Sequence, residues 1–242
     1  MIIYTNEMLQ EYLENDWILK LLLDEEKVED KGVRTHQWLK DMENKRLVFS
    51  HVYGDLLCNK KQEDDTKKVV LDVGGGYSAI TRRLIANHEY HLLDFIAHGG
   101  QDTIHYVEQE YQKRFWINGD WMDYDIASSP CDIIIANDIF PDVDQRLELF
   151  IEKYLPYCKE MRLVLTFYNE PKYYRTKRVD DAEVLTFLSW DGEITSIKLK
   201  KYIDRLVDTD RDDLDILKDI KDSIYWNGRQ VAYVTFRGEG RD

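Results

Sequence analysis

Three consecutive glycines follow an aspartate at the end of an apolar run, in the stretch LDVGGGYS at 71–78. Glycine loses more conformational freedom on folding than other residues and gives a core no side chain. A strand end therefore accepts Gly74, Gly75 and Gly76 only for a steep turn or a ligand that lies close to the backbone. With the residues that follow, they match the pattern G-x-G-x-x-A of dinucleotide-binding enzymes. A nicotinamide or flavin enzyme is one interpretation of this loop.

Asp72 favours a different ligand. Dinucleotide-binding folds usually have an apolar residue two positions before the first glycine, and here that residue is an acid. A carboxylate beside the glycine turn suits a ligand that carries an ammonium group and no phosphate. The loop therefore predicts a binding site whose ligand has to be identified from the surrounding elements.

Strands and helices alternate along residues 69–168, which predicts an α/β fold. Strands separated by helices of this length imply right-handed crossovers and a parallel sheet. Ligands of such sheets bind at the carboxyl ends of the strands. The expected strands lie at 69–73, 90–94, 115–118, 131–137 and 161–168, and the expected helices lie at 78–87, 101–113 and 143–158.

Both ends of the chain depart from this alternation. Residues 1–66 are expected to form a helical lid or substrate cap, because apolar residues recur there at helical spacing until the polar run at 59–68. Residues 67–242 then form the sheet domain. Asn227 and Gly228 lie between two β-rich runs and predict a hairpin, so the sheet should finish with an antiparallel strand pair. Within 183–206 two interpretations stay open: Asp191 and Gly192 turn a hairpin, or Asp191 caps a helix.

The stretch VVLDVGGGYS at 69–78 resembles the first motif of class I S-adenosylmethionine-dependent methyltransferases, which have a Rossmann-like parallel sheet. In this family the glycine loop lies against the methionine half of the cofactor. An acid that ends the second strand binds the ribose hydroxyls, and an acid after the third strand accepts the adenine amino group. Asp94 and Asp120 stand at these positions, and Trp121 is a candidate to stack on adenine. In this family the end of the fourth strand carries the residues that lie under the sulfonium of the cofactor. The segment ANDIFPDVD at 136–144 is similar to that strand end.

The resemblance, which covers about residues 69–237, implies an activity and a set of site residues. The expected cofactor is S-adenosylmethionine, and the expected reaction is methylation of an oxygen or a nitrogen atom of a small molecule, with O-methylation favoured. Asp138 and His51 are the candidate general bases for a hydroxyl acceptor. The triple GGGY is also similar to sugar O-methyltransferases found with bacterial surface-polysaccharide genes, which would place the reaction in polysaccharide biosynthesis. The cofactor-binding residues implied are Asp72, Gly74, Gly75, Gly76, Ser78, Asp94, Asp120, Trp121 and Asn137.

Two alternatives to this activity stay open. A nicotinamide-dependent oxidoreductase is compatible with the glycine pattern, although Asp72 and the expected terminal hairpin argue against it. A cofactor-binding partner that has lost its activity is compatible with every motif named above.

The charge of the chain narrows the class of acceptor. With 33 Lys and Arg residues against 47 Asp and Glu residues, the net charge is -14, which repels a phosphate backbone and argues against nucleic acid as substrate. The basic cluster KYYRTKR at 172–178 follows the last expected parallel strand, on the edge where ligands bind. Tyr173, Tyr174, Arg175 and Arg178 are therefore the candidate substrate residues, for a small anionic acceptor linked to a sugar or a nucleotide.

No cluster of histidine, cysteine or acidic residues has a convincing metal-ligand spacing, so we expect no metal. The three cysteines lie in unrelated contexts and favour a reducing cytosol, which predicts a cytoplasmic protein. The apolar run WILKLLL at 17–23 is interrupted by Lys20 and is too short to span a bilayer. We therefore expect no membrane partner, and the oligomeric state is left open.

Overall fold

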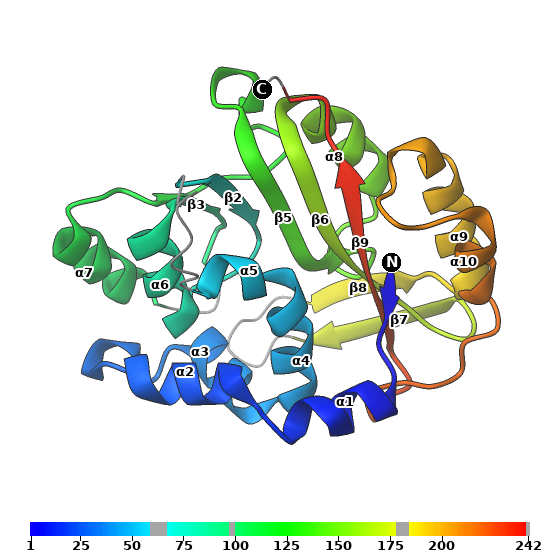
Figure 1. Cartoon of the computed structure of the whole chain (residues 1–242), viewed down its shortest axis with the longest axis horizontal. Helices are drawn as coiled ribbons and strands as arrows, with labels where there is room; N and C mark the ends of the chain where they lie inside the picture. The colour runs from blue at the N-terminus through cyan, green and yellow to red at the C-terminus, as the bar shows by residue number, and fades with distance from the viewer. Residues whose placement is uncertain (59–66, 97–99, 178–183, 241–242) are drawn as a thin grey trace.

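The predicted α/β alternation is present in the computed structural model of the chain (Figure 1). The structure describes residues 1–58, 67–96, 100–177 and 184–240. Within these ranges a seven-stranded sheet has the strand order β1-β9-β6-β5-β2-β3-β4. Its parallel part consists of β2, β3, β4, β5 and β6. Its strands are β1 (Ile2–Ile3), β2 (Val69–Val73), β3 (Glu89–Leu93), β4 (Trp116–Ile117), β5 (Cys131–Phe140), β6 (Cys158–Phe167) and β9 (Gln230–Arg237).

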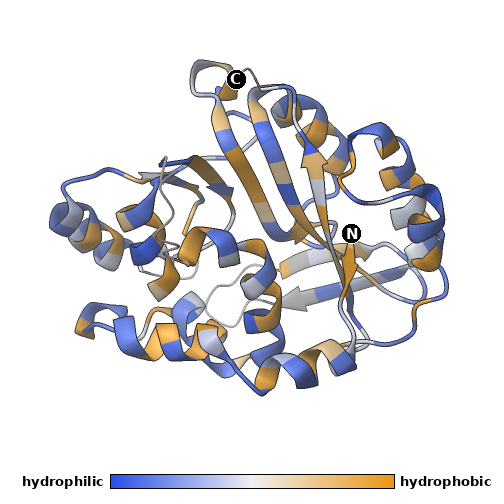
Figure 2. Cartoon of the chain, in the orientation of Figure 1, coloured by the Kyte–Doolittle hydropathy of each residue, from blue (hydrophilic) through white to orange (hydrophobic). Residues whose placement is uncertain are grey.

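The central strand β5 is buried on both faces, as expected for a parallel sheet. Ile133, Ile134 and Ile135 are all buried, and Figure 2 shows a long hydrophobic stretch along β5, whereas the helices carry mixed colours. The last crossover helix begins later than its predicted start at 143, because the backbone N–H groups of residues 143 and 144 both bond to the carbonyl of Ile139 in a turn. The crossover helices are α6 (Ala79–Asn87), α7 (Gln101–Tyr111) and α8 (Leu147–Tyr154).

Between β1 and β2 the chain forms a helical cap, whereas Ile2 and Ile3, inside the segment expected to be a helical lid, form a strand of the sheet. The first two helices of the cap begin at capping residues: the Thr5 hydroxyl accepts from the N–H of Met8, and the Asp16 carboxylate accepts from the N–H of Leu19. In Figure 1 the cap gathers below the carboxyl ends of β5 and β6. Its described elements are α1 (Asn6–Leu13), α2 (Trp17–Glu25), a 3-10 turn (Val28–Asp30), α3 (Arg34–Asp41), α4 (Glu43–Val52) and α5 (Gly54–Leu57).

Buried polar contacts fix the cap to the glycine loop and to α6. The Tyr77 hydroxyl donates to Asp30 at 2.7 Å, and the Arg82 guanidinium pairs with the same carboxylate at 3.3 Å. The Nδ1 atom of His36 accepts from the N–H of Ala79 at 3.1 Å. Cap residues also share one hydrophobic cluster with residues of β2 and α6. The cap is thus anchored beside the loop that it covers, while the boundary predicted at residue 66 lies outside the described residues and stays a prediction.

The predicted hairpin at Asn227 and Gly228 is wrong. A turn does form there, with Gly228 at φ 78° and its N–H bonded to the carbonyl of Tyr225. However, residues 221–226 form no strand. The chain after the turn enters β9, which pairs antiparallel with β6 from Gln230 to Arg237 and with β1 on its other side. The last strand therefore pairs with Glu160 to Phe167 of β6 in place of a local hairpin partner.

The segment that the sequence leaves open contains a strand and a helix. Asp191 caps a helix, because its carboxylate accepts from the N–H of Ile194 at 2.8 Å. Before it, an antiparallel ribbon stands apart from the main sheet, beside the cap in Figure 1. No helix among the described residues is long and apolar enough to cross a membrane. The remaining elements are β7 (Lys172–Lys177), β8 (Val184–Ser189), α9 (Gly192–Lys200), α10 (Arg211–Ile216) and 3-10 turns at Ile126–Ser128, Leu155–Tyr157 and Ile203–Arg205.

Candidate functional site

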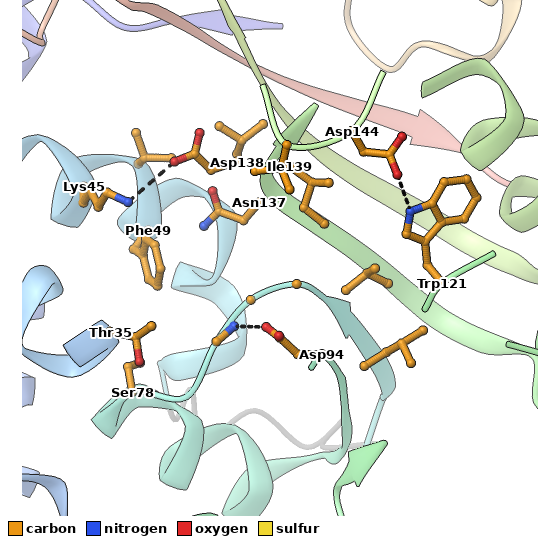
Figure 3. Close-up of a pocket in the computed structure, with 18 of the residues that line it drawn as sticks. Thr35, Lys45, Phe49, Ser78, Asp94, Trp121, Asn137, Asp138, Ile139 and Asp144 are labelled. Carbon is orange, nitrogen blue, oxygen red and sulfur yellow. Dashed lines mark hydrogen bonds and ion pairs between the residues drawn. The ribbon is translucent and has the colours of Figure 1, made fainter. Parts of the chain in front are cut away.

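A cavity of about 580 Å³ opens at the carboxyl ends of β2, β3 and β5 (Figure 3). This size lies within the roughly 300 to 1,000 Å³ of small-molecule sites. One part of its wall comes from the glycine loop, the ends of β3 and β5, and the turn after β4. The other part comes from α3 and α4 of the cap and from the segment that leads into β9. The cavity therefore lies where ligands of parallel α/β sheets bind.

The three glycines each make room for a protein side chain. A Cβ atom on Gly74 would lie 2.7 Å from Ile139, and one on Gly76 would lie 2.9 Å from Thr35 of the cap. A Cβ atom on Gly75 would collide with the carboxylate of Asp72. Gly74 and Gly76 also have φ values of 65° and 66°, which side chains disfavour. The loop lines the cavity, but close packing within the protein accounts for its composition.

Asp94 lies at the end of β3 and faces the cavity beside the glycine loop (Figure 3). One carboxylate oxygen accepts from the N–H of Gly76 at 3.0 Å, and the other accepts from the N–H of Ile96 at 2.8 Å. A carboxylate has about four acceptor positions, so each oxygen can accept a further hydrogen bond. Phe95 follows with 56% of its surface exposed and also lines the cavity. The sequence identifies Asp94 but not this ring.

Asp72 lies behind the glycine loop and is not among the described residues that line the cavity. One of its oxygens accepts from the hydroxyls of Tyr53 and Tyr90, at 3.0 and 2.8 Å, and the other has no hydrogen-bond partner among the described residues. Burial raises its pKa to about 7, against the opposing effect of the two tyrosine hydrogen bonds. The structure corrects the expected position of Asp72: it supports the loop from below instead of facing a ligand.

Asp120 and Trp121 both line the cavity, but Trp121 belongs mainly to the core. Its indole N–H donates to Asp144 at 2.9 Å, the guanidinium of Arg146 lies 4.7 Å from its ring centre, and its exposed fraction is 6%. Asp120 accepts from the N–H of Met122 at 2.8 Å. Little of the indole face is left for an adenine ring, so its stacking role stays a prediction.

Asn137 and Asp138 reach the cavity at the end of β5, where Figure 3 shows both side chains near the cap. Asp138, at φ 67°, accepts from Nη2 of Arg229 with both oxygens at 2.8 Å and lies 3.5 Å from the ammonium of Lys45. Burial alone would raise the pKa of Asp138, but the charges of Arg229 and Lys45 outweigh it, and the pKa is lowered. A carboxylate with a lowered pKa is a weak base, so the geometry argues against Asp138 as the general base.

His51 is the second candidate base, and the structure places it away from the described cavity wall. It lies on α4 with its ring 5.5 Å from that of Tyr4. Burial lowers its pKa, which keeps the imidazole neutral. A neutral imidazole can accept a proton, but His51 is not among the described residues that line the cavity, so the prediction of His51 as the base is corrected on position.

Ser78 lines the cavity where the glycine loop enters α6, and its backbone N–H donates to Thr81 at 3.1 Å. The neighbouring Ala79 N–H donates to His36, so both of these N–H groups have partners within the protein. The glycine loop, Ser78 and Asp94 thus line one cavity while Asp72 lies behind the loop, and their binding of a cofactor stays a prediction.

Three of the four candidate substrate residues, Tyr173, Tyr174 and Arg175, lie on β7 and are not part of the described cavity wall. Tyr173 has 70% of its surface exposed, and the ring of Tyr174 stacks on Phe187 at 5.1 Å. Arg175 is exposed on the same ribbon. Arg178 lies outside the described residues. Their contact with an acceptor stays a prediction that the cavity itself does not support.

The cap and the segment before β9 supply wall residues that the sequence does not reveal. In the sequence these wall residues look like ordinary core or surface positions, because the cavity forms only when α3 and α4 dock on the sheet. No group of three or more His, Cys, Asp or Glu side chains suited to a metal ion occurs in the described ranges. The additional wall residues are Thr35, Trp38, Leu39, Lys45, Val48, Phe49, Val164, Tyr225, Arg229 and Val231.

No protein-family model matches the chain, and no curated protein is similar to it in sequence. Several solved structures are similar to it in fold. The complex of DhpI with SAH is 13% identical, covers 92% of this chain and 98% of its own, and has a TM-score of 0.47. Magnesium protoporphyrin IX methyltransferase from Synechocystis, with bound SAM, is 12% identical, with 95% and 96% covered and a TM-score of 0.47. Coclaurine N-methyltransferase, bound to N-methylheliamine and SAH, is 14% identical, with 96% and 87% covered and a TM-score of 0.46.

At these identities and TM-scores the similarity leaves the activity of this chain open. The reaction has to be argued from the residues of the cavity.

Proposed function

We propose that the protein transfers a methyl group from S-adenosylmethionine to a small-molecule acceptor. The observation that carries this proposal is Asp94, a carboxylate at the end of β3 that faces the cavity beside the glycine loop. Its unused acceptor positions suit two neighbouring hydroxyl groups, such as those of a ribose. The exposed ring of Phe95 and the side chains of Ile139 and Val143 offer apolar surface next to it.

The residues around the loop fit this cofactor better than a dinucleotide. A pyrophosphate needs free N–H groups at the start of the helix that follows the glycines. Here the N–H of Ala79 bonds to His36, and the N–H of Ser78 bonds to Thr81. Thr35 of the cap packs against Gly76, where a phosphate would approach. These contacts favour a phosphate-free ligand and weigh against a nicotinamide-dependent oxidoreductase.

The chain's own residues would mainly bind and align. Asp94 would hold the ribose, the glycine loop and Ile139 would lie along the methionine half, and the cap would keep water from the reacting atoms. Bound there, the cofactor supplies an activated sulfonium methyl group. The acceptor's lone pair would take up this methyl group, the S–C electron pair would stay on sulfur, and the acceptor's proton would leave to solvent. Alignment of the two reactants supplies most of the rate enhancement, since neither candidate base is well placed.

Calorimetry with S-adenosylhomocysteine, S-adenosylmethionine and NAD on the full chain tests this proposal. The two sulfur compounds should bind and NAD should not. Asp94→Asn should weaken S-adenosylhomocysteine binding at least tenfold, while Asp102→Asn, which removes an exposed acid of α7, should leave it unchanged. Binding of NAD in place of the sulfur compounds would refute the proposal. Formation of S-adenosylhomocysteine with a panel of small acceptors then separates an enzyme from an inactive binding partner.

A further inference from the structure

The cavity extends beyond the part that the cofactor would fill. Its second half lies between α3 and α4 of the cap and the ends of β6 and β9. This half is built mostly from apolar side chains, and Figure 3 shows Phe49 directed into the space opposite Asn137. The apolar side chains of its wall are Leu39, Val48, Phe49, Val164 and Val231. A chamber of this composition suits a small apolar group, and its position places that group next to the expected methyl donor.

One end of this chamber carries a cluster of charged side chains. Lys45 and Arg229 both contact Asp138, so two cations share one carboxylate. Asp142 is the second carboxyl group near Arg229, and burial raises its pKa. Asp138 itself keeps a lowered pKa and stays charged. The two cations thus meet at one carboxylate in a mostly apolar wall, where an acidic group of a ligand would give them a further partner.

Lys45 is the cation best placed to meet such a ligand. Its side chain has 26% of its surface exposed, against 17% for Arg229, and it lines the cavity. An ammonium group has three donors, and the contact with Asp138 at 3.5 Å is long for a hydrogen bond. Arg229 is held more firmly, with both short bonds to Asp138 and its guanidinium 4.5 Å above the ring of Tyr225. Lys45 can thus turn toward a ligand while Arg229 keeps Asp138 in place.

We infer that the acceptor is a small acid with an apolar ring, whose carboxylate or phosphate binds Lys45 and whose ring lies in the apolar chamber beside Phe49. This inference rests on the proposed function, because it takes the other half of the cavity as the cofactor site. In this inference the anion binds to residues of the cap and of the segment before β9, and not to the basic residues of β7. The acidic group anchors the acceptor at one end, and the ring carries the atom to be methylated toward Asn137.

Ligand-observed NMR on the full chain, saturated with S-adenosylhomocysteine, tests the inference with four probes: benzoate, phenyl phosphate, benzamide and acetate. Benzoate or phenyl phosphate should bind at least tenfold more tightly than neutral benzamide and ringless acetate, and the stronger of the two identifies the acidic group. Lys45→Gln should reduce that binding at least tenfold. Lys40→Gln, which removes a lysine paired with Glu26 elsewhere on the cap, should leave it unchanged.

Equal binding of benzoate, phenyl phosphate and benzamide, no binding of either acid, or no effect of Lys45→Gln would overturn the inference. Acetate binding as tight as that of the acids would refute the role of the ring. The affinity for S-adenosylhomocysteine is measured first on each variant, and each probe is also measured without it. A protein that binds S-adenosylhomocysteine but not the acids contradicts this inference alone, whereas one that does not bind S-adenosylhomocysteine contradicts the proposed function.

Discussion

Replacing Asp72 with asparagine should change how the stability of the protein depends on pH. Burial raises the pKa of this carboxyl group from 3.8 to about 7. Because the folded-state pKa is the higher one, its contribution to stability is fully present below pH 3.8 and is lost as the pH rises through about 7. A difference of about 3 pKa units corresponds to about 4 kcal/mol in the free energy of unfolding. Asparagine keeps the shape and an oxygen for Tyr53 and Tyr90 but has no charge to bury.

Between pH 5 and pH 8, the unfolding free energy of the wild type should fall by about 2 to 3 kcal/mol through Asp72. Asp72→Asn should not show this part of the fall. Urea unfolding of both proteins at the two pH values gives this difference, and the subtraction cancels the other titrating groups. Asp24→Asn, which removes an exposed carboxylate of α2, controls for the loss of one negative charge. If Asp72→Asn and the wild type give parallel pH profiles, the argument that the buried carboxyl takes up a proton on folding is refuted.

Three further substitutions and one treatment test the rest of the structure. Asp94→Ala should weaken S-adenosylhomocysteine binding by about 1 to 3 kcal/mol, measured by calorimetry on a folded variant, and an unchanged affinity would contradict its role. Gly76→Val should lower the melting temperature and abolish that binding, because its Cβ meets Thr35 and its φ is 66°, and an unchanged melting temperature would count against the packing argument. Asp30→Ala should reduce the unfolding free energy by about 3 to 5 kcal/mol in urea titrations, since it leaves Arg82 buried and partly unpaired, and a loss below about 1 kcal/mol would contradict this. Dialysis against EDTA should leave methyl transfer unchanged, whereas loss of turnover restored by magnesium would show a metal requirement.

The parallel part of the fold could be predicted from sequence because each element is encoded locally. The run at 131–137 is almost entirely apolar, as a strand buried on both faces has to be, and β5 contains it. Asp94 was predicted from the family resemblance, as the acid that ends the second expected strand, and the structure places it directly after β3. The hairpin at Asn227 was predicted wrongly because the turn signal is local, whereas the partner of β9 is β6, far away in the chain.

The acceptor half of the cavity could not be predicted, because it exists only between elements. Phe49 and Lys45 lie on a cap helix whose pattern shows no more than an apolar face, and Arg229 follows a turn. Their meeting depends on how α4 docks against the ends of β5 and β9. The glycine loop shows the same limit: the sequence indicates that something must come close to Gly76, but only the fold identifies it as Thr35.

The pairing of β1 with β9 has a consequence for the order in which the protein is made and folds. Ile2 pairs with Tyr233 and Ile3 with Ala232, so the first strand of the sheet cannot bond to its neighbour until nearly all of the chain has been synthesised. Until then the cap also lacks Ile224, which belongs to its hydrophobic cluster. Contacts between such distant residues make folding slow, and the apolar face of the cap stays exposed meanwhile. On the ribosome, we therefore expect the N-terminal segment to complete its packing only after β9 has emerged.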